Sequence, residues 1–560
     1  MCKFIVNLLI IVSCWCTTGY AAGVPGKVAV ATAHPLATQA GLEILKKGGN
    51  AFDAAVAITA ALAVVEPYSS GLGGGGFWLL HRASDGRQIM VDGREMAPAK
   101  ATKNMYLDKQ GNVIPRQSLD GARAAGIPGI PAGMVFISEK YGRMSMVDTL
   151  RPAVTYAKKG FPVSDIYRKL AGYRLDVLRT SKAAADIYLH DNEVPPPGYM
   201  LFQKDLARIL IRIARHGNEG FYHGDTAKKL VDGVNKAGGI WTLDDLADYR
   251  VVERHPVVTH YHNMRVVSAP PPSSGGIVLA QILNILEHFN LDTMDDITRK
   301  HVIIEAMRRA YRDRAAYLGD PDFVDIDLSH LLNMDYLEGL ASTIELDRAT
   351  SSAEIGGLAF GGDSGENTTH FSVLDSEGNR VSATLSINLP FGSGFVAPGT
   401  GVLMNDEMDD FSIKPMEPNA YGLVGNDANS IAPHKRPLSS MTPTFVEKKE
   451  SIAILGTPGG SRIISMVLLA LLQYADGKTP QLWVRAPRYH HQFLPDEVQF
   501  EKGGLTAAEQ AGLKKLGHKL VEINRRYGNM QAILWYKPKD LVFAASDPRG
   551  EGEAIATTLP

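Results

Sequence analysis

The sequence predicts a fold that mixes helices and strands, of the α/β or α+β class, and two observations predict it. Apolar residues recur at helical spacing over several long stretches. Shorter runs rich in Val, Ile, Phe and Trp stand between Gly, Pro and Asn residues, as strands do. No internal repeat is found along the 560 residues, and periodicity alone does not decide between the two classes.

The N-terminal part begins with two helices followed by strands. Residues 38–66 show the pattern of two helices, the first of them amphipathic. Residues 51–65 are Ala-rich and apolar on nearly every side, so we expect this second helix to be buried. A run of glycines then leads into predicted strands at 77–80 and 88–91.

The middle of the chain is mostly helical. Helical patterns cover about 136–236 and resume at 275–276, continuing to about residue 354. Strand-like sequence at 250–268 lies between them. A glycine-rich segment, polar in its second half, follows at 355–367, and we expect it to be flexible.

A β-hairpin opens the last third of the chain. Its predicted strands are 368–374 and 380–387, joined by a turn rich in polar residues. A loop rich in Pro, Gly and Asn occupies 412–429. A strand at 452–455 and an apolar helix at 461–475 come next, and mixed elements continue to the end.

The composition points to a small-molecule ligand. Lys and Arg number 58 against 60 Asp and Glu, which leaves a formal charge of −2. This balance gives no electrostatic reason to expect nucleic acid or an anionic membrane as a partner.

The first residues have the three parts of a secretory signal. Lys3 precedes an apolar stretch at 4–16, and the small residues Ala21 and Ala22 follow it. We therefore predict that residues 1–22 are a signal peptide and that the protein is secreted or periplasmic. A membrane anchor is the alternative, but the apolar run is short for a span of about 20 residues.

All three cysteines, Cys2, Cys14 and Cys16, lie inside this leader. A lipoprotein is a further alternative, because the residues that end at Cys14 loosely resemble a lipobox. If the leader is removed, the mature chain has no thiol, which excludes a cysteine nucleophile, a cysteine-based metal site and a disulfide. No later segment has the length and apolarity of a membrane-spanning helix.

The junction between Asn367 and Thr368 is the most informative point of the chain. If the chain is cut there, Thr368 gains a free α-amine beside its hydroxyl. A Thr hydroxyl needs a neighbouring base to act as a nucleophile, and an N-terminal amine supplies one within the same residue. The alternative is a glycine-rich hinge before an ordinary hairpin.

Three other patterns could contribute to a site. Thr384, Ser386 and Asn388 share one face of a strand and could line a pocket, although a solvated face has the same pattern. Gly459 and Gly460 lie between a strand and a helix, where backbone N–H groups can hold an oxyanion; a plain tight turn is the alternative. The acidic residues at 405–410 lack the ligand spacing of a calcium loop.

Taken together, these segments resemble the motifs of the γ-glutamyltransferases, also called γ-glutamyl transpeptidases. The resemblance is collinear and spans nearly the whole mature chain. The matching positions are 34–37, 48–55, 73–77, 94–98, 271–276, 368–373, 378–381, Thr384, Asn388, 391–392, 408–411, 437–441 and 546–549.

The resemblance implies an N-terminal-nucleophile hydrolase, an α+β protein with an αββα sandwich. It implies that the precursor cleaves itself between Asn367 and Thr368. The products would be a large subunit, 23–367, and a small subunit, 368–560, which remain together as one folded unit. The expected substrates are glutathione and other γ-glutamyl compounds, with water, amino acids or peptides as acceptors, and no cofactor or metal.

The resemblance also implies a role for each site residue. Thr368 is the nucleophile, and the γ-glutamyl group it takes up carries a free α-carboxylate and a free α-ammonium. The carboxylate calls for hydrogen-bond donors and the ammonium for anionic or amide oxygens. The implied carboxylate ligands are Arg94, Ser439 and Ser440; the ammonium ligands Asp410, Glu407 and Asn388; the oxyanion donors Gly459 and Gly460; the hydroxyl that holds Thr368 is on Ser386; and Tyr421 lies in a lid.

Two positions depart from the family pattern. Ser386 stands where the family commonly has Thr, and Glu407 stands where some bacterial relatives have Gln. Two other functions remain open: a glutaryl or cephalosporin acylase of the same fold, and an inactive periplasmic relative that is not cleaved. A glutaryl group has no α-amine, so the presence of Asp410 and Glu407 beside Arg94 favours γ-glutamyl substrates.

Overall fold

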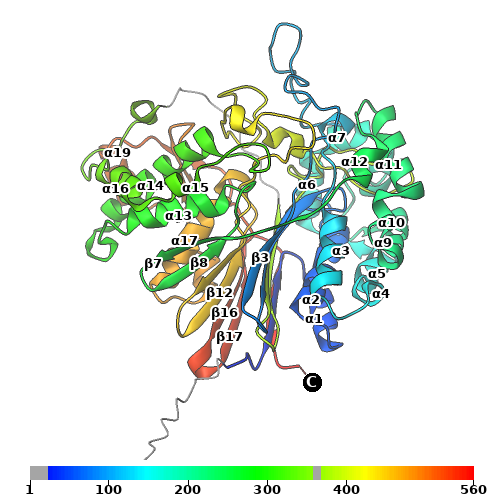
Figure 1. Ribbon diagram of the computed structural model, residues 1–560, viewed down its shortest axis with the longest axis horizontal. Helices are drawn as coiled ribbons and strands as arrows, with labels where there is room; N and C mark the ends of the chain where they lie inside the picture. Colours follow the sequence, from blue (N-terminus) through cyan, green and yellow to red (C-terminus); the bar gives the residue numbers. More distant parts are fainter. Residues whose placement is uncertain (1–22, 357–367, 560) are drawn as a thin grey trace, which may run out of the picture.

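The computed structural model describes residues 23–356 and 368–559 (Figure 1). The predicted signal peptide, 1–22, therefore lies outside the described residues, as does Asn367 of the predicted cleavage site. Within the described ranges, none of the helices is long and apolar enough to cross a membrane.

The fold is built on two antiparallel sheets. The seven-stranded sheet has the spatial order β18 (Glu553–Thr557), β1 (Val28–Thr32), β9 (Thr369–Leu374), β10 (Arg380–Ser386), β2 (Gly75–Arg82), β3 (Arg87–Gly93) and β6 (Val252–Arg254). The six-stranded sheet has the order β17 (Leu541–Ser546), β16 (Gln531–Tyr536), β12 (Ser451–Gly456), β11 (Thr444–Glu447), β8 (Met264–Ser268) and β7 (Val257–Tyr261).

The two sheets stack face to face, and a layer of helices covers each outer face (Figure 1). Apolar side chains from both sheets, such as Leu79 on β2 and Ile454 on β12, form the core between them. A second core joins the outer face of the seven-stranded sheet to the first two helices. The expected α+β fold with an αββα sandwich is confirmed.

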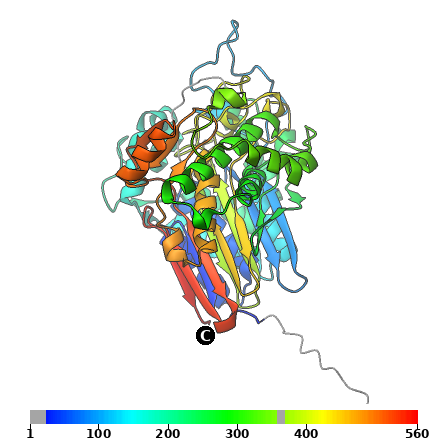
Figure 2. The ribbon, with the colours of Figure 1, turned by 90° about the vertical axis from the view of Figure 1, so that its left-hand side faces the viewer.

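The helical layers come from different parts of the chain, as the turned view in Figure 2 also shows. The helices over the seven-stranded sheet and beside it are α1 (Pro35–Lys46), α2 (Ala51–Val65), α3 (Ile130–Tyr141), α4 (Met146–Thr149), α5 (Arg151–Lys159), α6 (Asp165–Tyr173), α7 (Leu175–Thr180), α8 (Lys182–Tyr188), α9 (Lys204–His216), α10 (Glu219–Tyr222), α11 (Gly224–Lys236) and α12 (Leu243–Ala247). Those on the other side are α13 (Gly275–Leu286), α14 (Asp296–Tyr317), α15 (Leu328–Leu331), α16 (Met334–Ser342), α17 (Ile463–Ala475), α18 (Pro480–Trp483) and α19 (Ala507–Lys515).

Smaller elements complete the described chain. Two minor sheets contain β13 (Tyr489–His490), β14 (Val498–Glu501) and β15 (Leu520–Ile523), and β4 (Phe161–Pro162) with β5 (Met200–Leu201). Single 3₁₀ turns lie at Ala122–Ala124, Leu291–Thr293, Ser352–Ile355, Glu407–Asp410, Asp427–Asn429, Gly460–Arg462 and Lys537–Lys539.

Most predicted elements are present, with different ends. The two helices predicted at 38–66 are α1 and α2, and α2 is buried along its whole length as expected. The strand-like stretch at 250–268 is three separate strands, because Pro256 and the turn at His262 interrupt it. The apolar helix predicted from residue 461 begins at Ile463, because a 3₁₀ turn follows the left-handed glycines before it.

The order of strands interleaves segments from before and after the predicted nucleophile. β1 lies between β9, which follows Thr368, and β18, near the C-terminus. Segments from both sides of the predicted cleavage site therefore alternate within one sheet. A cut before Thr368 would leave the two pieces joined by strand pairing along β1–β9 and β10–β2.

Candidate active site

A small cavity brings together nearly all the site residues that the sequence predicts. Its volume is about 20 Å³, and it lies where β9 begins and β10 ends. Its described lining contains the predicted residues Arg94, Thr368, Ser386, Asn388, Glu407, Asp410, Tyr421, Ser439, Ser440 and Gly460. We refer to it below as the inner cavity.

Thr368 and Ser386 are cross-strand neighbours. The register of β9 and β10 pairs Leu385 with Thr369 and Thr384 with His370, so its continuation sets Thr368 opposite Ser386. The two hydroxyl oxygens are 3.4 Å apart, and both side chains are almost fully buried. The strand register therefore fixes the direction in which the Thr368 hydroxyl points.

The predicted pocket-lining face of β10 is only partly right. Ser386 and Asn388 line the inner cavity, but Thr384 does not. Its hydroxyl lies between the two sheets, 2.9 Å from Nδ1 of His370, whose pKa is lowered to about 3 by burial. Thr384 thus belongs to the sheet interface, because the cavity begins only where the strand ends.

The Gly459–Gly460 turn faces Thr368 from the six-stranded sheet. It follows β12, and both glycines have positive φ, 143° and 55°. A Cβ on Gly460 would lie 2.3 Å from the ring of Tyr421, and one on Gly459 would lie 2.4 Å from the methyl group of Met466. Backbone conformation and space both require glycine here, which brings the main chain close to the nucleophile.

Arg94 forms an ion cluster with three acids, Glu95, Glu407 and Asp410, of which the last two line the inner cavity. Nη1 of Arg94 donates to Oε2 of Glu407 at 2.6 Å, and Nη2 donates to Asp410. The Arg94 side chain is 1% exposed. Burial raises the pKa of Glu407 to about 7, although Arg94 opposes the shift.

One carboxylate oxygen of the two acids that line the cavity is left without a partner. Oε1 of Glu407 is buried and accepts no hydrogen bond from any described residue. Buried carboxylate oxygens are rarely left unsatisfied, and such cases call for an explanation. An acceptor of this kind, on the wall of a cavity, suits a cationic group of a ligand.

The Ser439–Ser440 loop is held by the residues before α13. Ser274 donates from its backbone N and from its hydroxyl to the carbonyl oxygen of Ser439, at 2.8 and 2.7 Å. The hydroxyl of Ser273 donates to the carbonyl oxygen of Met441 at 2.6 Å. The small polar residues after the three prolines therefore hold the loop that presents two hydroxyls to the cavity.

Tyr421, for which a place in a lid is predicted, lines the inner cavity. Its hydroxyl donates to the carbonyl oxygen of Asn388 at 2.9 Å, and its side chain is 4% exposed. Asn419 anchors the same loop by donating from Nδ2 to Oδ1 of Asp410 at 3.1 Å. The loop thus contacts both a cavity wall and the ion cluster.

Arg314 on α14 is a site residue that the sequence did not indicate. It is buried and donates to the hydroxyls of Ser274, at 3.0 Å, and Ser440, at 3.4 Å. Burial lowers its pKa to about 10. α14 carries charged residues on all sides, and a helix of that length in a globular protein must bury some of them. This pattern is the sequence signal that could have indicated a buried charged residue on α14.

One buried cluster has residue types that bind metals. His301, Glu305 and His518 place ligand atoms within 4.8 Å of one another. His301 is hydrogen-bonded at both nitrogens, at 2.7 Å to Nε2 of His518 and at 2.7 Å to the carbonyl oxygen of Glu345. Glu305 accepts from Arg308 and Arg309, so the cluster is a hydrogen-bonded network with two cations beside it.

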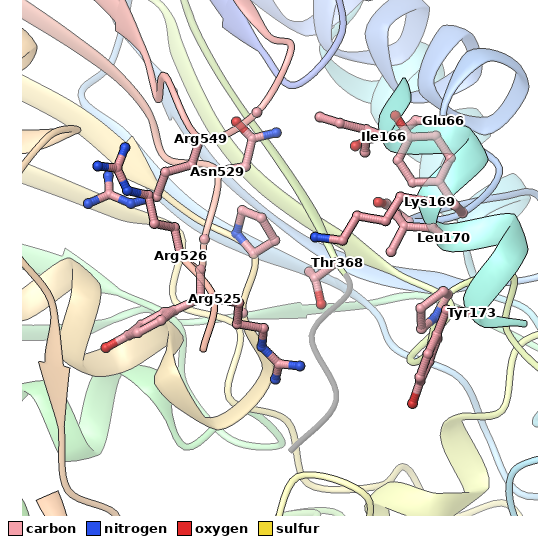
Figure 3. Close-up of a pocket in the computed structure, with 18 residues that line it drawn as sticks. Glu66, Ile166, Lys169, Leu170, Tyr173, Thr368, Arg525, Arg526, Asn529 and Arg549 are labelled. Atoms are coloured by element: carbon pink, nitrogen blue, oxygen red, sulfur yellow. The ribbon is translucent and has the colours of Figure 1, made fainter. Parts of the chain in front are cut away.

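A second, larger cavity, the outer cavity, meets the first at Thr368 (Figure 3). Its volume is about 280 Å³, and it is open to solvent. Gly459 lines it, with Glu66 after α2, Lys169 on α6 and Arg526. Gly459 therefore lines the outer cavity and Gly460 the inner cavity, and Thr368 lines both.

Comparison with known sequences gives one consistent family. The sequence model described as Gamma-glutamyltranspeptidase matches residues 37–557. A glutathione hydrolase proenzyme of Escherichia coli (strain K12) is 42% identical over 94% of this chain and 91% of its own length. One from Pseudomonas sp. (strain A14) is 44% identical over 93% of this chain and 92% of its own.

Comparison with solved structures gives the same fold. A cephalosporin acylase from Bacillus halodurans superposes with a TM-score of 0.83 at 28% sequence identity. The match covers 95% of this chain and 96% of that one. The fold is thus shared with a protein named as a cephalosporin acylase.

Proposed function

The chain belongs to the γ-glutamyltranspeptidase family, and on this premise we propose that it transfers γ-glutamyl groups through Thr368. The donors are glutathione and other γ-glutamyl amides. The acceptors are water, in hydrolysis, and amino acids or peptides, in transpeptidation. The observation that carries the proposal is that Thr368 lines the same cavity as the ion cluster of Arg94, Glu407 and Asp410.

The mature enzyme arises by cleavage between Asn367 and Thr368. The hydroxyl oxygen of Thr368 attacks the carbonyl carbon of Asn367, and the C–N bond breaks as the nitrogen takes up a proton. Breaking this bond frees the α-amine. Water then hydrolyses the resulting ester, which releases the carboxylate of Asn367 and regenerates the hydroxyl of Thr368. Strand pairing between the 23–367 and 368–560 pieces supports one folded unit of a large and a small subunit.

The inner cavity suits the two charges of a γ-glutamyl group. Arg94 and the hydroxyls of Ser439 and Ser440 can donate to the α-carboxylate. The unpaired Oε1 of Glu407, together with Asp410, can accept from the α-ammonium. Asn388 lines the same cavity and contributes its amide oxygen.

Transfer then proceeds in two acyl steps. The α-amine of Thr368 takes the hydroxyl proton as the oxygen attacks the γ-carbonyl carbon, and this proton passes to the departing amine. The Gly459–Gly460 turn lies at the nucleophile, where its N–H groups can stabilise the tetrahedral oxyanion. Water or an acceptor amine then attacks the γ-glutamyl ester. The α-amine of Thr368 takes a proton from this nucleophile and gives it to the departing Thr368 oxygen.

Two other functions are weaker. The structural similarity to a cephalosporin acylase supports the alternative that this chain is itself a glutaryl or cephalosporin acylase. A glutaryl group lacks the ammonium, so its entry would separate Arg94 from Glu407 and leave that carboxylate without a cationic partner. An inactive, uncleaved relative would have no need for Thr368 and Ser386 to be aligned in a cavity.

We further propose that the protein is secreted or periplasmic, with 1–22 as its signal peptide. Two features of the sequence support this location: the leader composition and the confinement of every cysteine to it.

Cleavage and activity can be tested together. The protein is expressed beside a Thr368→Ala variant, both are run on a denaturing gel, and any smaller band is sequenced from its N-terminus. We expect a band beginning Thr368-Thr369-His370 that is absent in the variant, and hydrolysis of γ-glutamyl amides in preference to glutaryl amides. An intact chain without activity would refute the proposal, and a preference for glutaryl amides would favour the acylase.

A further inference from the structure

The outer cavity has no role in binding the γ-glutamyl group, yet it shares Thr368 with the inner cavity. An acyl group held in the inner cavity presents its reacting carbonyl at Thr368. The remainder of the donor must then extend away from the inner cavity. The outer cavity is the space on the other side of the nucleophile, and an acceptor must approach the ester from the direction in which the leaving group departs.

The wall of the outer cavity is cationic. Its described lining includes Lys169, Arg525, Arg526 and Arg549. Figure 3 shows Lys169 reaching from α6 toward Thr368, with the arginines on the opposite side. Arg549 is paired with Asp547 and Glu501, whereas no carboxylate lies within ion-pair distance of Lys169 or Arg526 in the described part of the chain.

Glu66 is the acidic residue in that described lining, and it does not offset this charge at neutral pH. Its side chain is 3% exposed, and its Oε2 has no hydrogen-bond partner among the described residues. Burial raises the pKa of Glu66 to about 8, so the carboxyl is mostly protonated at pH 7. The field in the cavity therefore attracts anions.

We propose that the outer cavity binds the carboxylate of the leaving group and of the acceptor, with Lys169 as a specificity-determining residue. This inference rests on the proposed function and names the substrate class of the same site. Cysteinylglycine, the leaving group of glutathione, carries one carboxylate, as do acceptor amino acids and dipeptides. A charged ammonium on an exposed helix favours such a group without fixing its exact position.

The test compares substrates with and without this carboxylate. Glutathione and γ-glutamyl-p-nitroanilide share the γ-glutamyl group, but only glutathione has a carboxylate on the leaving side. As acceptors, glycylglycine and glycylglycine amide differ in the same way. The variants are Lys169→Gln and Lys169→Glu, with Lys169→Arg as the conservative change and Lys158→Gln, on the exposed end of α5, as the matched control.

We expect Lys169→Gln to lower kcat/KM for glutathione about fivefold, mainly through KM, as for loss of one exposed ion pair. Lys169→Glu should lower it further, and Lys169→Arg should retain it. γ-Glutamyl-p-nitroanilide hydrolysis and use of glycylglycine amide should stay within about twofold. The Lys158 variant should match the unchanged protein in all four assays.

Equal losses with the charged and the uncharged substrates would overturn the inference, and so would no loss with either. If the unchanged protein does not hydrolyse γ-glutamyl-p-nitroanilide, the proposed function itself fails, and the inference with it. The two failures are therefore distinguishable.

Discussion

Nη1 of Arg94 donates to Oε2 of Glu407 at 2.6 Å in the wall of the inner cavity that Thr368 also lines. Arg94 also donates to Asp410, so the charges of the site are paired with one another before a substrate arrives. A γ-glutamyl group carries both signs of charge, so its carboxylate can replace Glu407 at Arg94 while its ammonium replaces Arg94 at Glu407. Such an exchange leaves no buried charge unpaired, which is the condition for binding ions out of water at low cost.

The exchange predicts the effect of Glu407→Gln. We expect kcat/KM for a γ-glutamyl amide to fall at least tenfold, because a hydrogen bond from an ammonium to a carboxylate contributes about 1.5–3 kcal/mol. For a glutaryl amide, kcat/KM should fall less or should rise, because binding of this substrate to the variant no longer leaves the carboxylate of Glu407 without a cation. The measurement that checks this is the ratio of kcat/KM for the γ-glutamyl amide to kcat/KM for the glutaryl amide.

Glu522→Gln, at an exposed position, is the control and should leave the ratio unchanged. If Glu407→Gln left this ratio of kcat/KM values unchanged, Glu407 would not bind the substrate ammonium.

The contact between Thr368 and Ser386 predicts a graded pair of variants. Ser386 also accepts from the backbone N of Asn388 at 2.8 Å, so its hydroxyl fixes both the nucleophile and a cavity wall. We expect Ser386→Ala to lower kcat about tenfold or more and to slow cleavage, since a misplaced nucleophile loses reactive geometry. Ser386→Thr keeps the hydroxyl and should retain most activity.

Single-turnover kinetics and a time course of the cleaved band provide the two readouts. Equal activity of the Ala and Thr variants would show that the hydroxyl has no part in orienting Thr368.

The close approach of Gly460 to Tyr421 predicts a coupled pair. Gly460→Ala would place a Cβ 2.3 Å from the tyrosine ring. We expect a loss of about 2–4 kcal/mol in the free energy of unfolding, from backbone strain and overpacking together. Adding Tyr421→Ala should remove the overpacking part, so that the two changes are not additive.

Gly86→Ala is the matched control, because Gly86 has a φ of 70° and nothing within 4 Å of its Cβ position. It reports the strain alone. Additivity of Gly460→Ala and Tyr421→Ala in thermal or denaturant unfolding would contradict the contact.

The sequence predicted the fold and the inner cavity well for a physical reason. Period-2 alternation correctly places Ser386, at the end of β10, toward the cavity, and the glycine turn and hairpin are local features of the chain. Asn388 also lines the cavity, but it lies beyond the strand and has a positive φ. The prediction that failed concerns a position that depends on packing between residues far apart in the sequence. Thr384 shares the face of Ser386, but only the stacking of the second sheet shows that it is covered.

Two further residues could not be predicted from local sequence. Arg314 is a charged residue on a helix with charge all round, and its burial against Ser274 and Ser440 follows only from the packing of α14. Glu66 follows a buried helix at its C-terminal end, but its place beside Thr368 depends on which strands β9 pairs with.

Glu66 also predicts how stability depends on pH. Its pKa is about 8 in the folded protein, raised by burial from an ordinary value of 4.5. Between these two pH values the unfolded chain loses the proton and the folded chain keeps it. The folded state then binds more protons, so the free energy of unfolding falls as pH rises from about 4.5 to 8.

Glu66→Gln removes this ionisation and keeps the shape of the neutral carboxyl. We expect the variant to match the unchanged protein near pH 5 and to be more stable near pH 8, by on the order of 3 kcal/mol. Tm measured at intervals from pH 5 to 8.5 tests this, with Glu139→Gln, exposed on α3, as the control that should follow the unchanged protein. Parallel Tm curves for Glu66→Gln and the unchanged protein would show that the Glu66 carboxyl ionises at an ordinary pH, and the cationic wall of the outer cavity would then face a carboxylate rather than a neutral acid.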